Sequence, residues 1–408
     1  MPQSRMVSWA ALAWGLAVYL PVGPNYAGFV LLALALVFDR ASHAVRWRQL
    51  KTSAGWWAAC ALLAWTVLIL LLGPHYAQTS SNALHVLRLC LTLLLVLLLS
   101  PAEAACALAG FVMATVLSLV LVLLDQVFDL PPSVLWNRIV QYGGNKSLSN
   151  AVLLGLAAWV SLLLLLDLPR IGRVLALVLA AAALLAIMWV LPARTAWIVV
   201  LLGLLLAFLH RWQGQGRRQA VASLAALVLG LALALGVAPV RDRLLTGWDE
   251  ISQTVQGESV DLNKSWGIRA RMYEVTLDMI RDKPLTGWGV GAWNTLWDAS
   301  VAPREPKLVG LNMPHNDFLW MGAQTGLPGA VALLWVLLAG APRAWRQRDA
   351  SGRLGVVATG AIVVACMSNS ALRDASIGMS LWFVVAICQR LGREPLGAWL
   401  PWASARRS

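Results

Sequence analysis

Charged side chains are scarce in this sequence. Only 12% of the 408 residues are charged, whereas 59% are hydrophobic and the mean hydropathy is +0.70. Soluble domains carry about 25% charged residues and could not bury so much apolar surface in one core. The shortage of charge therefore excludes an ordinary soluble protein. It predicts an all-α polytopic membrane protein, because long apolar runs cross a bilayer as helices.

Metal and cofactor motifs are also missing. The five cysteines (Cys60, Cys90, Cys106, Cys366 and Cys388) all lie in apolar runs without CxxC spacing, as small buried hydrophobic residues do. The polar part of the chain has no DxD, HExxH or GxSxG motif and no Cys/His cluster. We therefore expect no metal site and no cofactor.

Carboxylates are almost absent from the apolar runs; Asp125, Asp129 and Asp167 fall at their ends. A proton- or sodium-coupled transporter needs ionisable residues inside the membrane, so this class has few residues to work with. The net charge of +13 does not predict nucleic-acid binding either. The positive residues form short clusters between apolar runs, as topology signals do.

Twelve apolar runs are interpreted as membrane spans, several of them near the lower length limit for a bilayer helix. They cover about residues 7–22, 25–39, 54–73, 84–100, 103–124, 150–168, 174–191, 195–210, 220–238, 317–340, 354–369 and 377–391. With the N-terminus inside, the cytoplasmic connectors hold 18 of the 32 Lys and Arg residues, and the short external connectors hold five. The excess of positive charge predicts cytoplasmic termini.

One connector differs from the others in length. Residues 239–316 form a long polar loop, which the orientation places outside the cytoplasm. It divides the chain into residues 1–238 with nine spans, the loop itself, and residues 317–408 with three spans and a short cytoplasmic tail. We expect the chemistry of the protein to take place at this loop.

Residues 268–281 within the loop have the period of a helix, with an apolar stripe and a charged face. Arg271 lies on the charged face, and Arg269 and Tyr273 lie on the flank between the two. An amphipathic helix resting on the membrane is the alternative that spacing alone favours. The helix is predicted to end before Pro284.

A glycine-dense turn follows, with Gly287, Gly289 and Gly291 in five residues. Glycine lets the backbone approach a ligand closely. The turn neither follows a strand nor opens a helix, so it does not predict a dinucleotide site.

Arg194 lies between two apolar runs that have almost no connector. A cation at the mouth of a helix pair is either an interfacial anchor or a ligand for an anion. Taken alone, Arg194 fits the anchor better.

His315 follows Pro314 and is predicted to lie in the first turn of the helix that forms the tenth run. The positive end of the helix dipole would lower its pKa and keep it neutral, as a general base requires. Gly322 and Gly326 lie on the same helical face and form a GxxxG pair, which allows another helix to pack closely below. An interfacial histidine that caps a packed helix is the equal alternative.

Two segments resemble a known family. His315-Asn316, nine residues and then Gly326-Leu327-Pro328-Gly329 fit the pattern H-[NSQ]-x9-G-x-x-[GTY] of the O-antigen ligases. Arg269-x-x-x-Tyr273 and residues 282–291 resemble R-x-x-x-W … D-x-P-L-x-G-x-G-x-G of the wider O-antigen ligase and polymerase superfamily, with Tyr273 in place of Trp. The twelve spans with one large periplasmic loop match the same architecture.

The resemblance implies a GT-C-like glycosyltransferase of the Gram-negative inner membrane, with its active site on the periplasmic side. Such enzymes transfer O-antigen from undecaprenyl diphosphate to a sugar of the lipid A-core. The implied partners are therefore this lipid-linked donor, the lipid A-core acceptor and membrane lipids, without nucleic acid. His315 would be the catalytic residue. The diphosphate would be bound by Arg194 and by Arg269 or Arg271, with support from Tyr273, Asn316, Gly287, Gly289 and Gly291.

These residue types suit a metal-independent, inverting displacement. A diphosphate is already a good leaving group, guanidinium groups can stabilise its charge, and a neutral histidine can take the proton of the acceptor hydroxyl. Three alternatives remain: an O-antigen polymerase, an oligosaccharyltransferase that glycosylates proteins, and, from another class, a transporter or lipid flippase.

Overall fold

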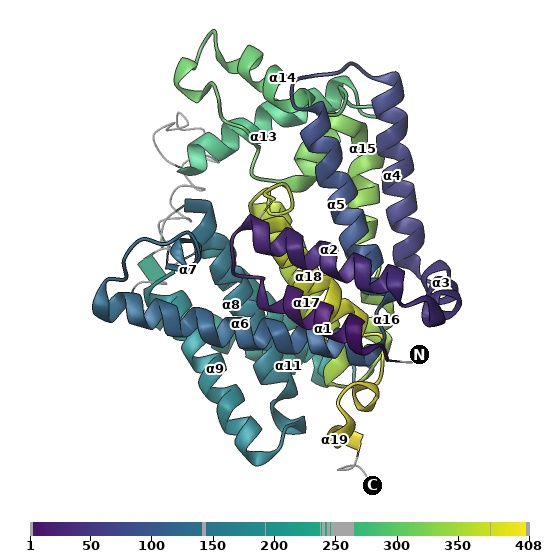
Figure 1. Cartoon of the computed structure of the whole chain (residues 1–408). Helices are drawn as coiled ribbons and strands as arrows, with labels where there is room; N and C mark the ends of the chain where they lie inside the picture. Colours follow the sequence, from purple (N-terminus) through teal and green to yellow (C-terminus); the bar gives the residue numbers. More distant parts are fainter. Residues whose placement is uncertain are drawn as a thin grey trace.

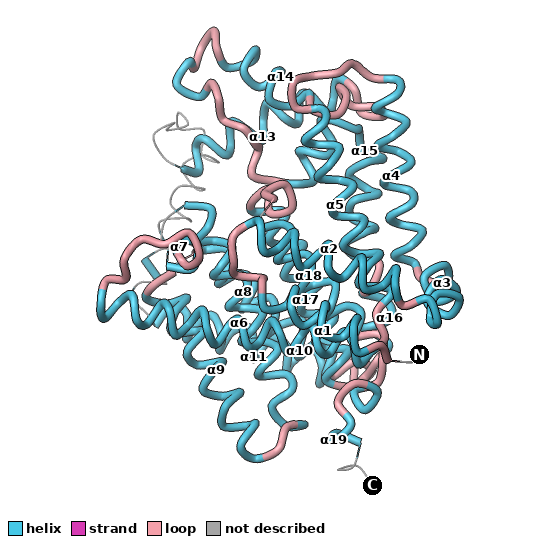
Figure 2. The backbone as a smooth tube through the Cα atoms, in the orientation of Figure 1, coloured by secondary structure: helices cyan, strands magenta, loops and turns pink. Residues whose placement is uncertain are grey.

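The computed structural model describes residues 3–140, 144–191, 193–236, 238, 241–242, 245, 265–375 and 377–404. The described residues form helices and loops and contain no β-strand (Figure 2). The helices are α1 (Arg5–Leu16), α2 (Val22–Phe38), α3 (His43–Lys51), α4 (Ala54–Leu72), α5 (Thr79–Leu98), α6 (Pro101–Phe128), α7 (Asn137–Val140), α8 (Gly144–Leu164), α9 (Arg170–Trp189), α10 (Arg194–Arg211), α11 (Arg217–Gly236), α13 (Ser265–Asp282), α14 (Ala292–Val301), α15 (Asp317–Leu338), α16 (Ala341–Arg346), α17 (Ala350–Ser368), α18 (Ile377–Leu391) and α19 (Pro401–Ser404).

A helix occupies each of the twelve predicted runs. Among the described residues, eight helices are long and apolar enough to cross a membrane, or nine if α2 and the segment Arg40–Lys51, bent by 70°, form one span. Helices α1 and α18 are shorter, with 12 and 15 residues. The chain is therefore an all-helical polytopic membrane protein, and the number of twelve spans stays a prediction.

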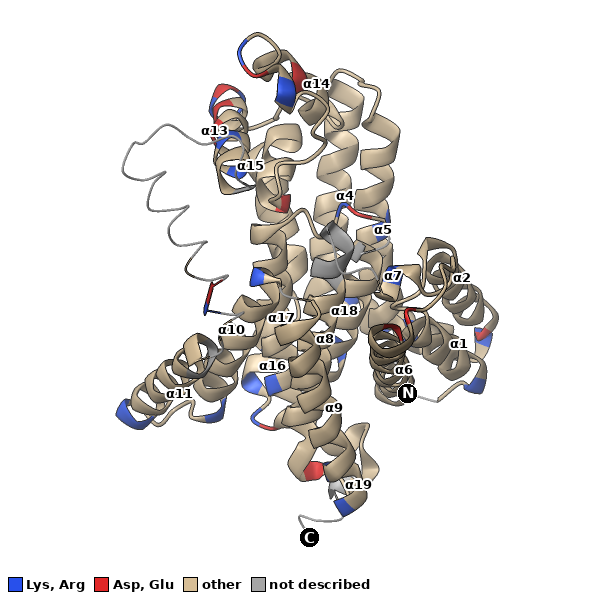
Figure 3. Ribbon diagram, turned by 90° about the vertical axis from the view of Figure 1, so that its left-hand side faces the viewer, with Lys and Arg blue, Asp and Glu red and all other residues tan. Residues whose placement is uncertain are grey.

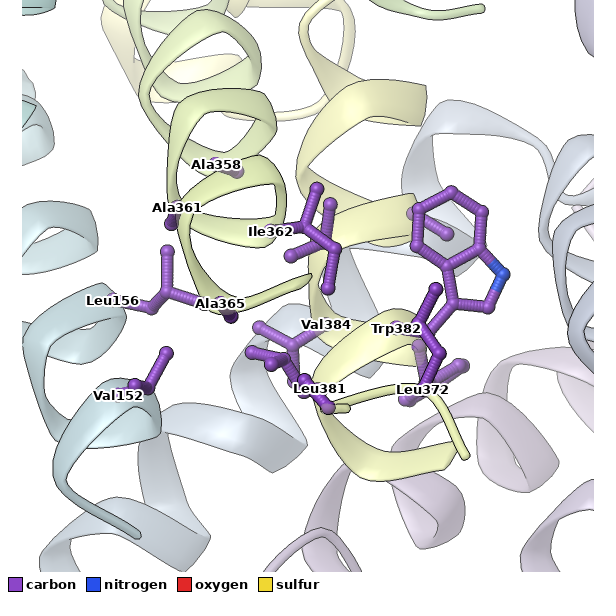
Figure 4. Packing of buried hydrophobic residues seen from close by; sticks show 14 of the residues in the cluster. Val152, Leu156, Ala358, Ala361, Ile362, Ala365, Leu372, Leu381, Trp382 and Val384 are labelled. Carbon is purple, nitrogen blue, oxygen red and sulfur yellow. The ribbon is translucent and has the colours of Figure 1, made fainter. Parts of the chain in front are cut away.

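Helix α17 lies at the centre of the packing. Figure 4 shows its alanines, Ala358, Ala361 and Ala365, close to side chains of α8 and α18. Helices α10, α15 and α16 also contact α17. Small side chains allow neighbouring helices to approach closely. Because α17 packs against five other helices, its position in the protein is well defined, and so are the positions of its two ends.

The long helices carry their charges mostly near their ends (Figure 3). Helix α15 begins beside α13 and α14 and leads at its other end into α16, which lies towards α3 and the N-terminus (Figure 1). We call these two sides of the molecule the loop end and the α16 end. Their assignment to the two sides of a membrane stays a prediction, as do the three predicted segments of the chain. Residues 246–264 of the predicted loop lie outside the described residues.

Helix α15 is broken at Gly326, whose φ of 72° and ψ of 177° are not helical. The predicted continuous face below His315 is therefore wrong. A Cβ at Gly322 would lie 2.9 Å from Ile280 of α13, so a helix does pack closely there. Beyond Gly322, the break redirects the backbone, and Pro328 follows it.

The glycine turn closes this break. The N–H of Trp288 donates to the carbonyl of Ala323 at 2.9 Å, and the N–H of Leu327 donates to the carbonyl of Pro284 at 2.7 Å. Inside a membrane protein, backbone groups freed by a broken helix must find partners in the protein. The turn supplies them.

Gly287, Gly289 and Gly291 all have positive φ, at 65°, 107° and 93°. A Cβ at Gly287 would lie 2.4 Å from the carbonyl carbon of Gln324, and one at Gly291 would lie 2.5 Å from the backbone nitrogen of Thr79. These approaches require glycine. The backbone of the turn thus approaches α15 and the start of α5. Sequence analysis had suggested that it approaches a ligand.

Gly326→Ala is expected to lower the thermal unfolding midpoint strongly, because a Cβ at this position would lie 2.2 Å from the carbonyl oxygen of Leu285. Gly310→Ala is the matched control. Gly310 also has a positive φ, of 86°, but no atom lies within 4 Å of the added Cβ, so only backbone strain of about 1–2 kcal/mol is expected. Equal losses in thermal unfolding of the detergent-purified variants would contradict this role of Gly326.

Candidate functional site

The candidate site is built on the C-terminal end of α17. The last carbonyl groups of a helix have no partner within the helix. Here Arg269 Nη1 donates to the carbonyl of Ser368 at 3.3 Å. Tyr273 Oη and Asn316 Nδ2 donate to the carbonyl of Met367 at 3.3 and 3.2 Å. The partial negative charge of this helix end also stabilises a cation such as Arg269.

His315 lies one residue before the N-cap of α15, so its predicted position in the first turn is wrong. The N-cap is Asn316, whose Oδ1 accepts hydrogen bonds from the N–H groups of Phe318 and Leu319 at 3.0 Å each. His315 has a φ of 53°, a left-handed conformation that is uncommon for residues other than glycine. In this conformation its Nδ1 lies 2.7 Å from Oδ1 of Asn369, directly after α17.

This contact selects one form of the imidazole. Oδ1 of Asn369 is only an acceptor, so Nδ1 of His315 must donate the proton. In the neutral ring, Nε2 then keeps its lone pair. His315 is thereby prepared to accept a proton at Nε2.

The surroundings of His315 also favour its neutral form. Burial is the largest cause and lowers the pKa of the imidazole below its usual range. The hydrogen bond to Asn369 acts in the opposite direction, and the positive charge of Arg269 lowers the pKa further. The direction agrees with the prediction, which had named the dipole of the following helix as the cause.

Arg269 and Arg271 have different surroundings. Arg271 forms ion pairs with Glu305 at 2.9 Å and with Glu274 at 2.8 Å. Residues i and i+2 of an α-helix are separated by about 200° around its axis. Arg269 and Arg271 therefore lie on nearly opposite faces of α13. Of the two arginines, Arg269 is the one that contacts the end of α17.

Arg194 is the first residue of α10 and is half-buried. The next residue, Thr195, has its Oγ1 3.1 Å from Oγ of Ser368. Ser368 also accepts the hydrogen bond from Arg269. The start of α10, the helix α13 and the His315 segment therefore meet at the same end of α17.

Sequence analysis missed Ser368, Asn369 and Asp317. Asn369 is 3% exposed and holds His315, while Oδ2 of the buried Asp317 accepts the N–H of Leu372 at 3.0 Å and fixes the loop after α17. The polar triplet Ser368-Asn369-Ser370 at the end of an apolar run was an available signal. Among the residues with described side chains, no three His, Cys, Asp or Glu gather where they could hold a metal ion. The metal-free site stays a prediction.

One part of the chain, which carries several but not all residues of this site, is similar to a known protein family. Residues 190–334 match a family model described as O-antigen ligase. The matched segment includes Arg194, Arg269 and His315 and ends before α17. No curated protein matches the chain.

Arg269→Gln is expected to raise the pKa of His315, because removal of a nearby cation favours the imidazolium form. Histidine-labelled protein is titrated by NMR, and the His315 signal is assigned by its loss in His315→Gln. Arg271→Gln, which removes the same charge from a side chain paired with Glu274 and Glu305, should leave this pKa nearly unchanged. A fall in pKa, or equal shifts in both arginine variants, would refute the electrostatic contact between Arg269 and His315.

Proposed function

We propose that this chain, whose residues 190–334 match a family model described as O-antigen ligase, is a member of the O-antigen ligase/polymerase superfamily and transfers an O-antigen glycan from undecaprenyl diphosphate to a sugar of the lipid A-core. The observation that carries the proposal is the hydrogen bond between His315 and Asn369, which leaves Nε2 as a proton acceptor beside Arg269. We further propose that the loop end is periplasmic, that both termini are cytoplasmic, and that the protein resides in the inner membrane.

In the proposed reaction, the hydroxyl oxygen of the acceptor sugar attacks the anomeric carbon of the donor. The bond between that carbon and the diphosphate oxygen breaks, and undecaprenyl diphosphate leaves with the electron pair. The hydroxyl proton moves to Nε2 of His315. A neutral imidazole at physiological pH is suited to this step, and the lowered pKa of His315 supports it. A single displacement inverts the anomeric configuration.

Arg269 and Arg194 are the proposed ligands of the diphosphate. Guanidinium groups bind phosphate oxygens with two parallel hydrogen bonds and stabilise the charge that develops as the bond breaks. The contacts of Arg269 and Thr195 with Ser368 support a common position for both cations. Arg271, with its two carboxylate partners, is proposed as a structural residue of the loop.

A hydrophobic groove supports a polyprenyl donor. The groove has a volume of about 980 Å³ and runs between α6, α8 and α9. Its lining extends to Trp189 and Val190 at the end of α9, and Arg194 follows shortly after them in the chain. We propose that part of the lipid chain lies in this groove while the diphosphate reaches Arg194.

The function is tested by transfer assays with purified protein, undecaprenyl diphosphate-linked glycan and lipid A-core, with and without EDTA. His315→Ala should lose about 10²–10⁴-fold in rate, the usual contribution of a general base. Arg269→Ala should also lose transfer, because the leaving diphosphate is no longer stabilised. Arg271→Ala is the matched control and should stay near wild type.

Three outcomes would replace the proposal. Growth of glycan on the carrier lipid, without transfer to the lipid A-core, would assign the polymerase reaction. Transfer to a protein acceptor would assign an oligosaccharyltransferase. Movement of lipid-linked glycan across liposomes without any covalent transfer would assign a transporter or flippase. Loss of transfer on addition of EDTA would contradict the metal-independent mechanism.

Asn369→Asp is expected to shift the acidic limb of the pH–rate profile to higher pH. A carboxylate at this position favours the imidazolium form of His315 and so raises its pKa. The base then becomes neutral only at higher pH. Asn369→Ala, which removes the acceptor, should lower kcat without this shift. An unchanged profile for Asn369→Asp would show that Asn369 does not position His315 for catalysis.

A further inference from the structure

A polar pocket lies at the α16 end, remote from His315 along α15. It has a volume of about 370 Å³ and is lined by Arg343, Arg390, Arg393 and Glu394, among others. Arg343 belongs to α16 and Arg390 to the last turn of α18, while Arg393 and Glu394 directly follow α18. Three guanidinium groups thus share the pocket with one carboxylate.

Two of the arginines have protein partners. Arg390 is 2% exposed and donates from Nε to the carbonyl of Leu99 at 3.0 Å and from Nη1 to Glu394 at 2.9 Å. Arg343 is exposed and donates to the carbonyl of Thr52 at 3.3 Å. The single lining carboxylate is therefore already engaged by Arg390.

Arg393 is different. Its Nε and Nη2 are buried and find no hydrogen-bond partner among the described residues. Burial, followed by the like charges of Arg390 and Arg343, lowers the pKa of the Arg393 guanidinium to about 9. Another buried carboxylate at this end, Glu103, is bonded to Arg46 at 2.7 Å. Buried guanidinium nitrogens without hydrogen-bond acceptors are costly, and an anion in the pocket would supply the missing acceptors.

Topology signals do not explain this arrangement. Positive residues that orient a membrane protein need only lie in the connectors, where water solvates them. Arg390 is 2% exposed, and two nitrogens of Arg393 are buried and have no hydrogen-bond partner among the described residues. The pocket has the features of a binding site for an anion.

We propose that this pocket binds a phosphate group, because guanidinium forks match the geometry of phosphate oxygens and bind them with charge-assisted hydrogen bonds. The phosphate has two possible sources, the head group of an anionic phospholipid and a soluble phosphate compound. The neighbourhood favours the head group. Helix α3 bends away from α2 by 70° at this end, and Lys51 lies 5.0 Å from the ring of Trp47, a pairing suited to a membrane interface.

The test uses the full chain, purified in detergent and depleted of lipid, without any saccharide, so its outcome is independent of the proposed transferase function. Thermal unfolding is followed with micelles containing dioleoylphosphatidylglycerol, with micelles containing dioleoylglycerol, which lacks phosphate, and with sodium phosphate against sodium chloride at equal ionic strength. Phosphatidylglycerol is expected to raise the unfolding midpoint where dioleoylglycerol does not. A rise with sodium phosphate as well would show that the bare phosphate is sufficient and would extend the site to soluble compounds.

Arg393→Gln should weaken the response at least about ten-fold in ligand concentration, because charge-assisted hydrogen bonds are lost. Arg343→Gln, an exposed substitution at the same pocket, should also weaken the response and provides a second variant if Arg393→Gln folds poorly. Arg218→Gln is the charge-matched control, because Arg218 is exposed near the start of α11 at the same end and does not line the pocket. Equal responses of wild type and both pocket variants, or no response of wild type to either phosphate-bearing probe, would overturn the proposal.

Discussion

The unpaired carbonyl groups at the end of α17 are the constraint on which the candidate site depends. A helix cannot satisfy its last carbonyls internally, and α17 is enclosed by other helices, so partners must come from elsewhere in the protein. Arg269, Tyr273 and Asn316 provide them from segments distant in sequence. The residues of the proposed chemistry are thus held in place by a requirement of the fold, and Asn369 adds the contact that orients His315.

The break in α15 has a related role on the other side of the site. The glycine turn fills the break with its own backbone and joins α13 to α15, so Arg269 and His315 are fixed relative to each other. Oε1 of Gln324, beside the break, accepts hydrogen bonds from Asn82 near the start of α5 and from the N–H of Gly291, so it joins α15 to α5 and to the glycine turn. Glycines that resemble a ligand-binding motif therefore support the proposed reaction through packing.

The sequence was sufficient to predict the helices, because apolar runs of membrane length have few other structures open to them. The resemblance to the O-antigen ligases implied Arg194, Arg269 and His315 as site residues, and the structure brings their three segments to one helix end. The sequence could not say which of Arg269 and Arg271 is the proposed diphosphate ligand. The two differ in their tertiary partners, the end of α17 for Arg269 and Glu305 for Arg271, and both partners are remote in sequence. The left-handed conformation of His315 and the role of Asn369 depend on the same tertiary contact. The break at Gly326 had a local signal in Pro328, but a proline alone does not reveal what fills a break.

The two polar sites at opposite ends of α15 share one physical feature, guanidinium groups in enclosed surroundings with few carboxylates. At the loop end these groups accompany a histidine that can accept a proton, whereas no histidine lines the pocket at the α16 end. The central claim is that α17 presents His315 as a neutral imidazole with Nε2 free. Nitrogen-15 NMR of histidine-labelled protein at pH 7 tests it directly. We expect a protonated Nδ1 and an unprotonated Nε2, and the Nε2-protonated tautomer or the imidazolium form would contradict this claim.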